Sequence, residues 1–342
     1  MLHVLRKNRH CFPFYIILGL LLLLIVAFIS VQTGYRDISF LSFMQTILGN
    51  GTAENVLTIF HFRLPRICMA ILVGFGIAVS GAILQSITKN ALADPGIMGI
   101  NAGAGFAIVL YTFFLQGWMV SKAWLAVFVM PLIALIGALL AALIIYVIAY
   151  KSGHVAPSHM LLVGIGMNAA FSAGIIFFQI RMDPNDFTRT LVWLAGSIWG
   201  STWTYVYALL PWIVVLLPIA FYKARVLDIL MLNDITAIGV GITVTKERKQ
   251  LIIVAVLLAG VCVAVGGGIT FLGLLAPHIA KKLVGGLHFR VIPLSAFVGA
   301  LLLILADTIS RIMIAPAELP VGIVLAIIGA PYFIYLLVKT RG

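Results

Sequence analysis

The sequence has few charged residues. Asp, Glu, Lys and Arg make up 9% of its 342 residues, whereas 63% are hydrophobic and the mean hydropathy is +1.18. Soluble globular domains carry about 25% charged residues, so this composition excludes that class. Apolar runs of eighteen or more residues recur along the chain, and no polar stretch is long enough for a second domain. We therefore expect an all-α polytopic membrane protein, with residues 1–342 as one transmembrane domain.

Several catalytic motifs are absent. The sequence contains no GxxxxGK[ST], no HExxH and no GxSxG, and its seven His do not cluster at metal-ligand spacing. The chain is thus not expected to bind ATP through a P-loop of its own or to hold a metal or other cofactor. A membrane enzyme and an ion-coupled secondary transporter remain as alternatives, although the second class usually buries ionisable residues near the midplane and few are found here.

Cysteine is also scarce. Cys11, Cys68 and Cys262 are far apart in apolar context, so we expect core residues rather than a disulfide framework. The net charge of +12 would suggest a nucleic-acid partner in a soluble protein. In a polytopic chain it is better explained by basic residues held on the cytoplasmic side, so no nucleic-acid partner is expected.

Hydropathy predicts about ten transmembrane helices. The predicted spans are 14–31, 65–87, 95–115, 123–149, 158–180, 203–222, 250–267, 271–287, 293–312 and 320–338. Placing both termini inside puts fifteen Lys and Arg in the inner loops and seven in the outer ones. This bias predicts a multi-pass protein of the cytoplasmic membrane with both termini cytoplasmic. In the outer connection, residues 181–189 are expected to form a polar loop and 191–199 a short re-entrant or interfacial helix.

The inner connection 223–250 stands out by its charge. It holds eight of the thirty-two Asp, Glu, Lys and Arg, so it must lie in water on the cytoplasmic face. Helical spacing predicts a helix through Leu230, an N-cap at Asn233-Asp234, and one more turn over Ile235–Ile238, with Ala237 inside it, that ends at Gly239. Two short helices presenting apolar residues suggest a docking surface for another protein. A solvated loop lying on the membrane surface is the alternative.

Residues 72–83 and 258–269 are identical at six matched positions, which hold Leu, Gly, Ala, Val, Gly and Ile. The predicted topology makes the two copies run in opposite directions, which indicates an inverted repeat of the kind that builds alternating-access pathways.

A few charges lie within or beside the spans. Asp307 and Arg311 are four residues apart and are expected to pair, for structural or functional reasons. Asp94, before Pro95, is expected to cap a turn rather than carry protons. Arg63 and Arg66 flank Pro65 at an outer helix start, where they can mark an external mouth or only snorkel.

Several long motifs then resemble one family. These are RLPR at 63–66, AILVGFGIAVSGAILQSITKNALADPGIMGINAGAG at 70–105, GGGITFLGLLAPHIAKKLVG at 266–285, IPLSAFVGALLLILADTISR at 292–311 and ELPVGIVLAIIGAPYFIYLL at 318–337. They resemble the FecCD family of ABC-importer permeases, which includes cobalamin and ferric-siderophore permeases, and the resemblance covers about residues 14–340. It implies an inverted-repeat fold of ten spans. It also implies partners: a second permease subunit, the same or paralogous, two cytoplasmic ATPase subunits that use ATP-Mg, an extracytoplasmic substrate-binding protein, and membrane lipid.

The resemblance also implies residue roles. Arg63, Arg66 and Arg311 match arginines that dock the binding protein, and the 223–250 connection matches the segment that docks the ATPase. An inner gate is implied at Asn90, Leu92, Pro157 and Ser158, and pathway residues at Met167, Asn168 and Ser172. Ala91 and His159 depart from the family pattern, which usually has Pro and Arg there. His278 is read as structural. The implied cargo is an iron–siderophore complex, with cobalamin or haem as alternatives.

Overall fold

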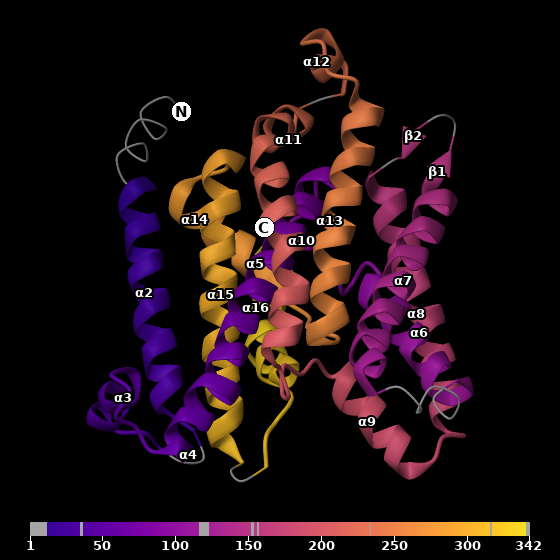
Figure 1. The fold of residues 1–342 in the computed structure, drawn as a ribbon. Helices are drawn as coiled ribbons and strands as arrows, with labels where there is room; N and C mark the ends of the chain where they lie inside the picture. Colours follow the sequence, from indigo (N-terminus) through magenta and orange to yellow (C-terminus); the bar gives the residue numbers. More distant parts are fainter. Residues whose placement is uncertain are drawn as a thin grey trace.

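The computed structural model describes residues 12–34, 37–115, 123–151, 154–155, 157–232, 234–314 and 317–339. Asn233, Cys11 and the terminal basic residues Arg6, Lys7, Arg9 and Arg341 lie outside these ranges. Figure 1 shows the helices gathered into one bundle with α12 at one end and α3, α4 and α9 at the other. We call these the α12 end and the α9 end.

The long helices of the bundle correspond to the ten predicted spans. They are α2 (Phe12–Gln32), α5 (Leu64–Ile87), α6 (Ile100–Phe114), α7 (Ala123–Ala149), α8 (Pro157–Gln179), α10 (Trp203–Tyr222), α13 (Val244–Gly266), α14 (Leu272–Val284), α15 (His288–Met313) and α16 (Val321–Lys339). Within the described ranges, seven helices are long and apolar enough to cross a membrane, and Ile100–Phe114 and Val321–Tyr335 are shorter apolar helices. The prediction of an all-helical polytopic chain is confirmed.

Shorter elements connect these helices. They are α3 (Phe40–Ile47), α4 (Ala53–Val56), the π-helical turn η1 (Leu57–Arg63), the strand pair β1 (Tyr150–Lys151) and β2 (His154–Val155), α9 (Pro184–Leu194), α11 (Ala224–Leu230) and α12 (Asp234–Gly239). α4, η1 and α5 form one continuous apolar stretch from Ala53 to Ile87. The π turn ends at Arg63, the first residue of the RLPR motif, so the irregular backbone runs into that motif. Single π turns inside helices are frequent at functional sites.

Several helix boundaries differ from the prediction, including the starts of α13 at Val244 and α15 at His288, six and five residues before the predicted spans. α6 begins at Ile100 rather than residue 95, because the chain first turns through Gly99, which has a φ of +83°. The outer helix is α9 at Pro184–Leu194, not 191–199, so the expected polar loop 181–189 is mostly helical. Asp183 takes the N-cap position and Pro184 the first helical position, and both favour a helix start there. Gly196, with a φ of +79°, follows the end of this helix.

α5 lies at the centre of the bundle and packs against α10, α13, α14 and α15. The approach is close because small residues face each other. A Cβ at Gly74 would lie 2.6 Å from the Cα of Ala300 on α15, and one at Gly81 would overlap the carbonyl oxygen of Gly273 on α14. Cys262 of α13 packs against Gly76, and Cys68 and Cys262 are free thiols, as predicted.

This packing makes Gly81 sensitive to substitution. We expect Gly81→Ala to lower the free energy of unfolding by about 1–3 kcal/mol, because α5 must move away from the backbone of α14. A matched control is Gly166→Ala on α8, where an added Cβ meets no atom within 4 Å. Thermal unfolding of the detergent-solubilised chain measures both. Equal melting temperatures for the two variants would contradict the close contact of α5 with α14.

The two copies of the predicted repeat lie on packed helices that run in opposite directions (Figure 1). The end of α5 and the start of α13 both lie at the α12 end, where Lys89 and Arg248 each contact Asp234. The copies differ at one point. Residues 72–83 are helical throughout, whereas α13 ends at Gly266 and Gly267 has a φ of +70°.

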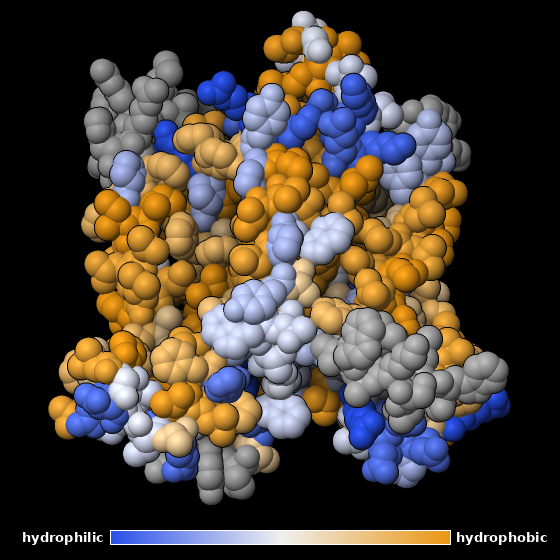
Figure 2. Space-filling view, in the orientation of Figure 1, coloured by the Kyte–Doolittle hydropathy of each residue, from blue (hydrophilic) through white to orange (hydrophobic). Residues whose placement is uncertain are grey.

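The surface has the hydropathy of a membrane protein. On the face that Figure 2 shows, a hydrophobic band covers the middle of the bundle, interrupted near its centre by paler and more polar residues, and strongly hydrophilic residues lie toward both ends. Many large apolar side chains of the long helices are exposed, including those of Leu24 and Val147. The tip formed by α12 is again hydrophobic, although it stands beyond the hydrophilic layer (Figure 2). This tip is part of the candidate site.

Candidate functional site

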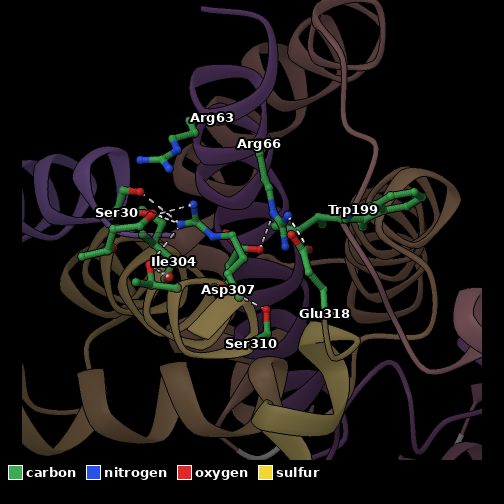
Figure 3. A network of polar contacts seen from close by, with 12 residues as sticks. Ser30, Arg63, Arg66, Trp199, Ile304, Asp307, Ser310 and Glu318 are labelled. Atoms are coloured by element: carbon green, nitrogen blue, oxygen red, sulfur yellow. Dashed lines mark hydrogen bonds and ion pairs between the residues drawn. The ribbon is translucent and has the colours of Figure 1, made fainter. Parts of the chain in front are cut away.

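Three groups of predicted residues come together in space, the first at the α9 end. There Arg66 of α5 donates from Nε to Asp307 Oδ1 and from Nη1 to Glu318 Oε2, both at 2.7 Å. Arg311 Nε lies 3.3 Å from Asp307 Oδ2, so the predicted Asp307–Arg311 pair is confirmed. Figure 3 shows Asp307 and Glu318 on either side of the Arg66 guanidinium. Two arginines and two carboxylates thus form one neutral network between α5, α15 and the segment before α16.

Backbone carbonyls at the end of α2 accept hydrogen bonds from Arg63 and Arg311. Arg63 donates to the carbonyl oxygens of Val31 and Gln32, the second at 3.0 Å. Arg311 donates to the carbonyl oxygen of Ser30 at 3.2 Å and to that of Thr33 at 3.3 Å. These carbonyls belong to the end of α2 and the residue after it, where the last turn of a helix leaves carbonyls without intrahelical partners. The arginines therefore also hold α2 against the core.

All three arginines are buried. Arg63, Arg66 and Arg311 are 7%, 9% and 6% exposed, and Asp307 is 1% exposed. Buried charges are expensive unless paired, which explains why each finds a partner here. In this conformation their charges are directed inward, and Glu318, at 28% side-chain exposure, is the most accessible member of the network. The docking role expected for the arginines stays a prediction.

The second group is the connection between α10 and α13, which folds into α11 and α12 as predicted. Leu230 and Ala237 are buried against the bundle, whereas Ile235 and Ile238 are 78% and 63% exposed. Gly239 is the last residue of α12, and Gly241 follows with a φ of +88°. α12 therefore presents two isoleucines outward from a helix beyond the hydrophobic band.

Ion pairs hold this connection in place. Asp234, the first residue of α12, contacts Arg248 of α13 at 3.2 Å and Lys89 at 3.7 Å. Lys223 contacts Glu247 at 2.6 Å and Gln250 at 2.8 Å. The segment is thus attached to α13 and to the turn that follows α5, rather than lying loosely on the surface.

The third group lies beside that turn, at the α12 end. A cavity of about 650 Å³ is lined by all four predicted gate residues, Asn90, Leu92, Pro157 and Ser158. Other lining residues include Lys89, Leu161 and His278. Asn90 Oδ1 accepts from the backbone N–H of Leu92 at 2.8 Å, which shapes the turn. The ring of His278 lies edge-on to Tyr332 of α16, 5.6 Å between centroids.

A further cavity of about 400 Å³ is lined by Asn168 and Ser172 of α8, together with Leu194, Gly268 and Phe271. Two of the three predicted pathway residues therefore face one space. Met167 instead packs against the hydrophobic core. The neighbours of Met167 on α8 are apolar, so the sequence pattern does not indicate which side of the helix faces the cavity.

Asp94 stabilises the backbone between the two cavities. It is 1% exposed, and its Oδ1 accepts from the backbone N–H of Gly96 at 2.8 Å. The expectation that it caps a turn is confirmed. Its carboxylate also faces the backbone N–H groups of Gly273 and Leu274 in the first turn of α14. Asp94 thereby joins the turn after α5 to the helix that carries His278, a role that the sequence alone did not indicate.

This fold defines a permease of the metal-chelate ABC-transporter class. The chain superimposes with a TM-score of 0.82 on a solved structure described as an inward-facing conformation of a metal-chelate type ABC transporter, at 28% identity over 96% of this chain and 99% of that one. Residues 22–339 match the FecCD transport family, so the chain belongs to that family. The resemblance inferred from the motifs is confirmed.

Two relatives are similar over nearly their whole length. The iron(3+)-hydroxamate import system permease protein FhuG of Bacillus subtilis is 52% identical over 94% of this chain and 95% of its own. The iron-uptake system permease protein FeuC of the same organism is 42% identical over 94% of this chain and 96% of its own. Permease subunits of this class are not enzymes themselves, and the ATPase is a separate subunit.

Proposed function

We propose that this chain is the permease subunit of a binding-protein-dependent importer that moves iron–siderophore complexes across the cytoplasmic membrane by alternating access. The cargo is inferred from the 52% identity to a permease named for iron(3+)-hydroxamate import, so the siderophores best supported are hydroxamates.

The exposed pair Ile235 and Ile238 carries the proposal for ATP coupling. An apolar helix surface beyond the hydrophobic band is costly in water unless a partner covers it. The proposed partner is one of two cytoplasmic ATPase subunits, which use ATP-Mg. The α12 end is accordingly the cytoplasmic end, in agreement with the excess of basic residues in the loops predicted to be inside.

A second permease subunit, the same or paralogous, completes the pathway, and an extracytoplasmic binding protein delivers cargo at the α9 end. Alternating access then opens the space beside Asn168 and Ser172 and the gate cavity at Asn90, Leu92, Pro157 and Ser158 in turn. Because Arg63, Arg66 and Arg311 are satisfied internally here, docking of the binding protein through them requires a conformation in which the network opens.

The proposal is tested by uptake into proteoliposomes that contain this chain, its ATPase and the binding protein. We expect uptake of a ferric hydroxamate that requires ATP and continues when an uncoupler is present. Ferric citrate, haem and cobalamin, each offered with the same binding protein, serve as comparison cargoes. Uptake that is abolished by the uncoupler but is unaffected by ATP depletion would indicate a secondary transporter. Turnover of a substrate by the purified chain alone would indicate an enzyme.

A further inference from the structure

A buried chain of three polar side chains crosses the α12 end of the bundle. Asp228 Oδ1 on α11 lies 2.6 Å from Nδ1 of His288, the first residue of α15, and accepts from the His288 backbone N–H at 2.9 Å. On the other side of the ring, His288 Nε2 is hydrogen-bonded to the Ser86 hydroxyl on α5. Ser86 and His288 are 1% and 2% exposed, and the side chain of Asp228 is 26% exposed. One imidazole thus joins three helices.

Ser86, His288 and Asp228 are hydrogen-bonded in the same order as the residues of a Ser–His–Asp catalytic triad, but the serine is not accessible to a substrate. A nucleophilic serine must reach a substrate, whereas the Ser86 hydroxyl is closed off inside the bundle and also donates to the Ala82 carbonyl oxygen at 2.8 Å. The three residues therefore hold structural elements in position. The carboxylate fixes the ring through two N–H groups, and the ring fixes the end of α5.

The two ends of this chain lie next to the two functional parts of the α12 end. Asp228 is six residues before Asp234, where α12 with its exposed isoleucines begins. Ser86 is in the last turn of α5, directly before the turn that carries Asn90 and Leu92 into the gate cavity. α11 also packs against both α5 and α15. A displacement of α11 therefore reaches the gate turn through a short, continuous set of contacts.

Lys89 makes a second, weaker connection between the segment that carries α12 and the gate turn. Lys89 Nζ donates to the carbonyl oxygen of Leu232 at 2.7 Å and lies 3.7 Å from Asp234, but the Lys89 and Asp234 side chains are 35% and 47% exposed. Exposed ion pairs contribute little because water and salt screen them. Breaking the buried chain, in contrast, leaves polar groups without partners in a closed interior. The buried chain is thus the stronger of the two links.

We propose that Asp228, His288 and Ser86 are positioning residues that transmit the movement of the ATPase-docking segment to the inner gate. The proposal rests on the function proposed above. Docking or hydrolysis in the ATPase moves α11, and the imidazole carries that movement to α5 and to the gate turn, so that the gate opens in step with hydrolysis.

The test measures uptake and ATP hydrolysis in the same proteoliposomes containing the complete importer and a ferric hydroxamate. We expect Asp228→Ala and His288→Ala to lower the number of chelates imported per ATP hydrolysed at least tenfold. The ATPase should still copurify, and hydrolysis should stay within twofold of wild type. Asp228→Asn keeps an acceptor oxygen for both N–H groups of His288 and should recover most of the ratio.

Glu247→Gln is the matched control, because it removes the charge from an equally short contact, with Lys223, that holds the same segment to α13 rather than to α15. It should keep the wild-type ratio, and Lys89→Gln should lower the ratio less than twofold. Ser86→Ala changes the volume little, so it folds even if the alanine variants of Asp228 and His288 do not assemble, and it should lower the ratio about threefold.

A wild-type ratio in Ser86→Ala and Asp228→Ala would overturn the proposal. Uptake and hydrolysis that fall in parallel would also overturn it, because they would show a purely structural role. Failure of the proposed function is distinguishable from failure of this proposal. If the proposed function were wrong, the wild-type importer itself would show no ATP-driven uptake.

Discussion

Asp307→Asn is expected to destabilise the folded chain by about 3–5 kcal/mol, the usual cost of removing one partner from a buried ion pair. Asp307 is 1% exposed and contacts both Arg66 and Arg311. An asparagine of the same shape keeps an acceptor oxygen but leaves the network with one negative charge for two buried guanidinium groups. Glu318 still pairs with Arg66, so Arg311 loses its carboxylate and keeps only the oxygens of Ser30 and Thr33 and its weak contact with Thr308.

Thermal unfolding in detergent measures this effect, and we expect the melting temperature to fall by on the order of 10 °C. Glu318→Gln is the control, because its carboxylate is 28% exposed and should contribute less. Replacing Arg66, Asp307 and Arg311 together by apolar residues of similar volume should recover stability relative to Asp307→Asn, since no unpaired charge then remains buried. If the single and triple variants melt together well below wild type, the loss comes from packing and not from charge.

Ile235→Asp combined with Ile238→Asp is expected to release the ATPase subunit. The two side chains are 78% and 63% exposed in the chain alone, so the substitutions disturb no internal packing. In the proposed complex they fill the partner's docking cleft, where truncating a central apolar residue costs about 2 kcal/mol or more. Two such losses, with the added cost of burying carboxylates, should weaken the association at least about a hundredfold.

Copurification of the ATPase in detergent, together with its hydrolysis rate in the eluted complex, measures this prediction. Leu48→Asp is a matched control at the opposite end, where the leucine is 74% exposed after α3. It should leave copurification unchanged. An intact complex with both isoleucines replaced would remove the argument that α12 is the docking surface, while unchanged melting temperatures in all variants would show that the comparison concerns folded protein.

Local patterns in the sequence were sufficient to predict the helices and part of the candidate site. The apolar runs predicted the spans because a helix in lipid satisfies its own backbone hydrogen bonds, so that length and hydropathy alone decide it. The charged connection predicted α11 and α12 for a related reason, since the signals for caps and glycine termination lie within one turn of the helix ends. The outer helix was misplaced because hydropathy outweighed an N-cap signal at Asp183-Pro184 that was present in the sequence.

The motif resemblance predicted the gate residues, and the structure brings them to one cavity although Asn90 lies in the turn after α5 and Pro157 at the start of α8. Met167 packs against the core instead, since the rotation of α8 against its neighbours decides which of its residues face the cavity. Helix rotation is set by packing of small residues such as Gly74 and Gly81 against distant helices, and a single helix does not encode it.

The sequence by itself determined much of the local structure: which runs lie in lipid, which connection stands in water, and that Asp307 and Arg311 pair across one turn. Only the tertiary structure decided where the other charges find partners. Arg66 is 241 residues from Asp307 and 252 from Glu318, and His288 is 202 residues from Ser86. Hydrophobic periodicity extends over a few helical turns, whereas these pairings arise because buried polar groups must be satisfied by whichever groups the packed helices bring within reach.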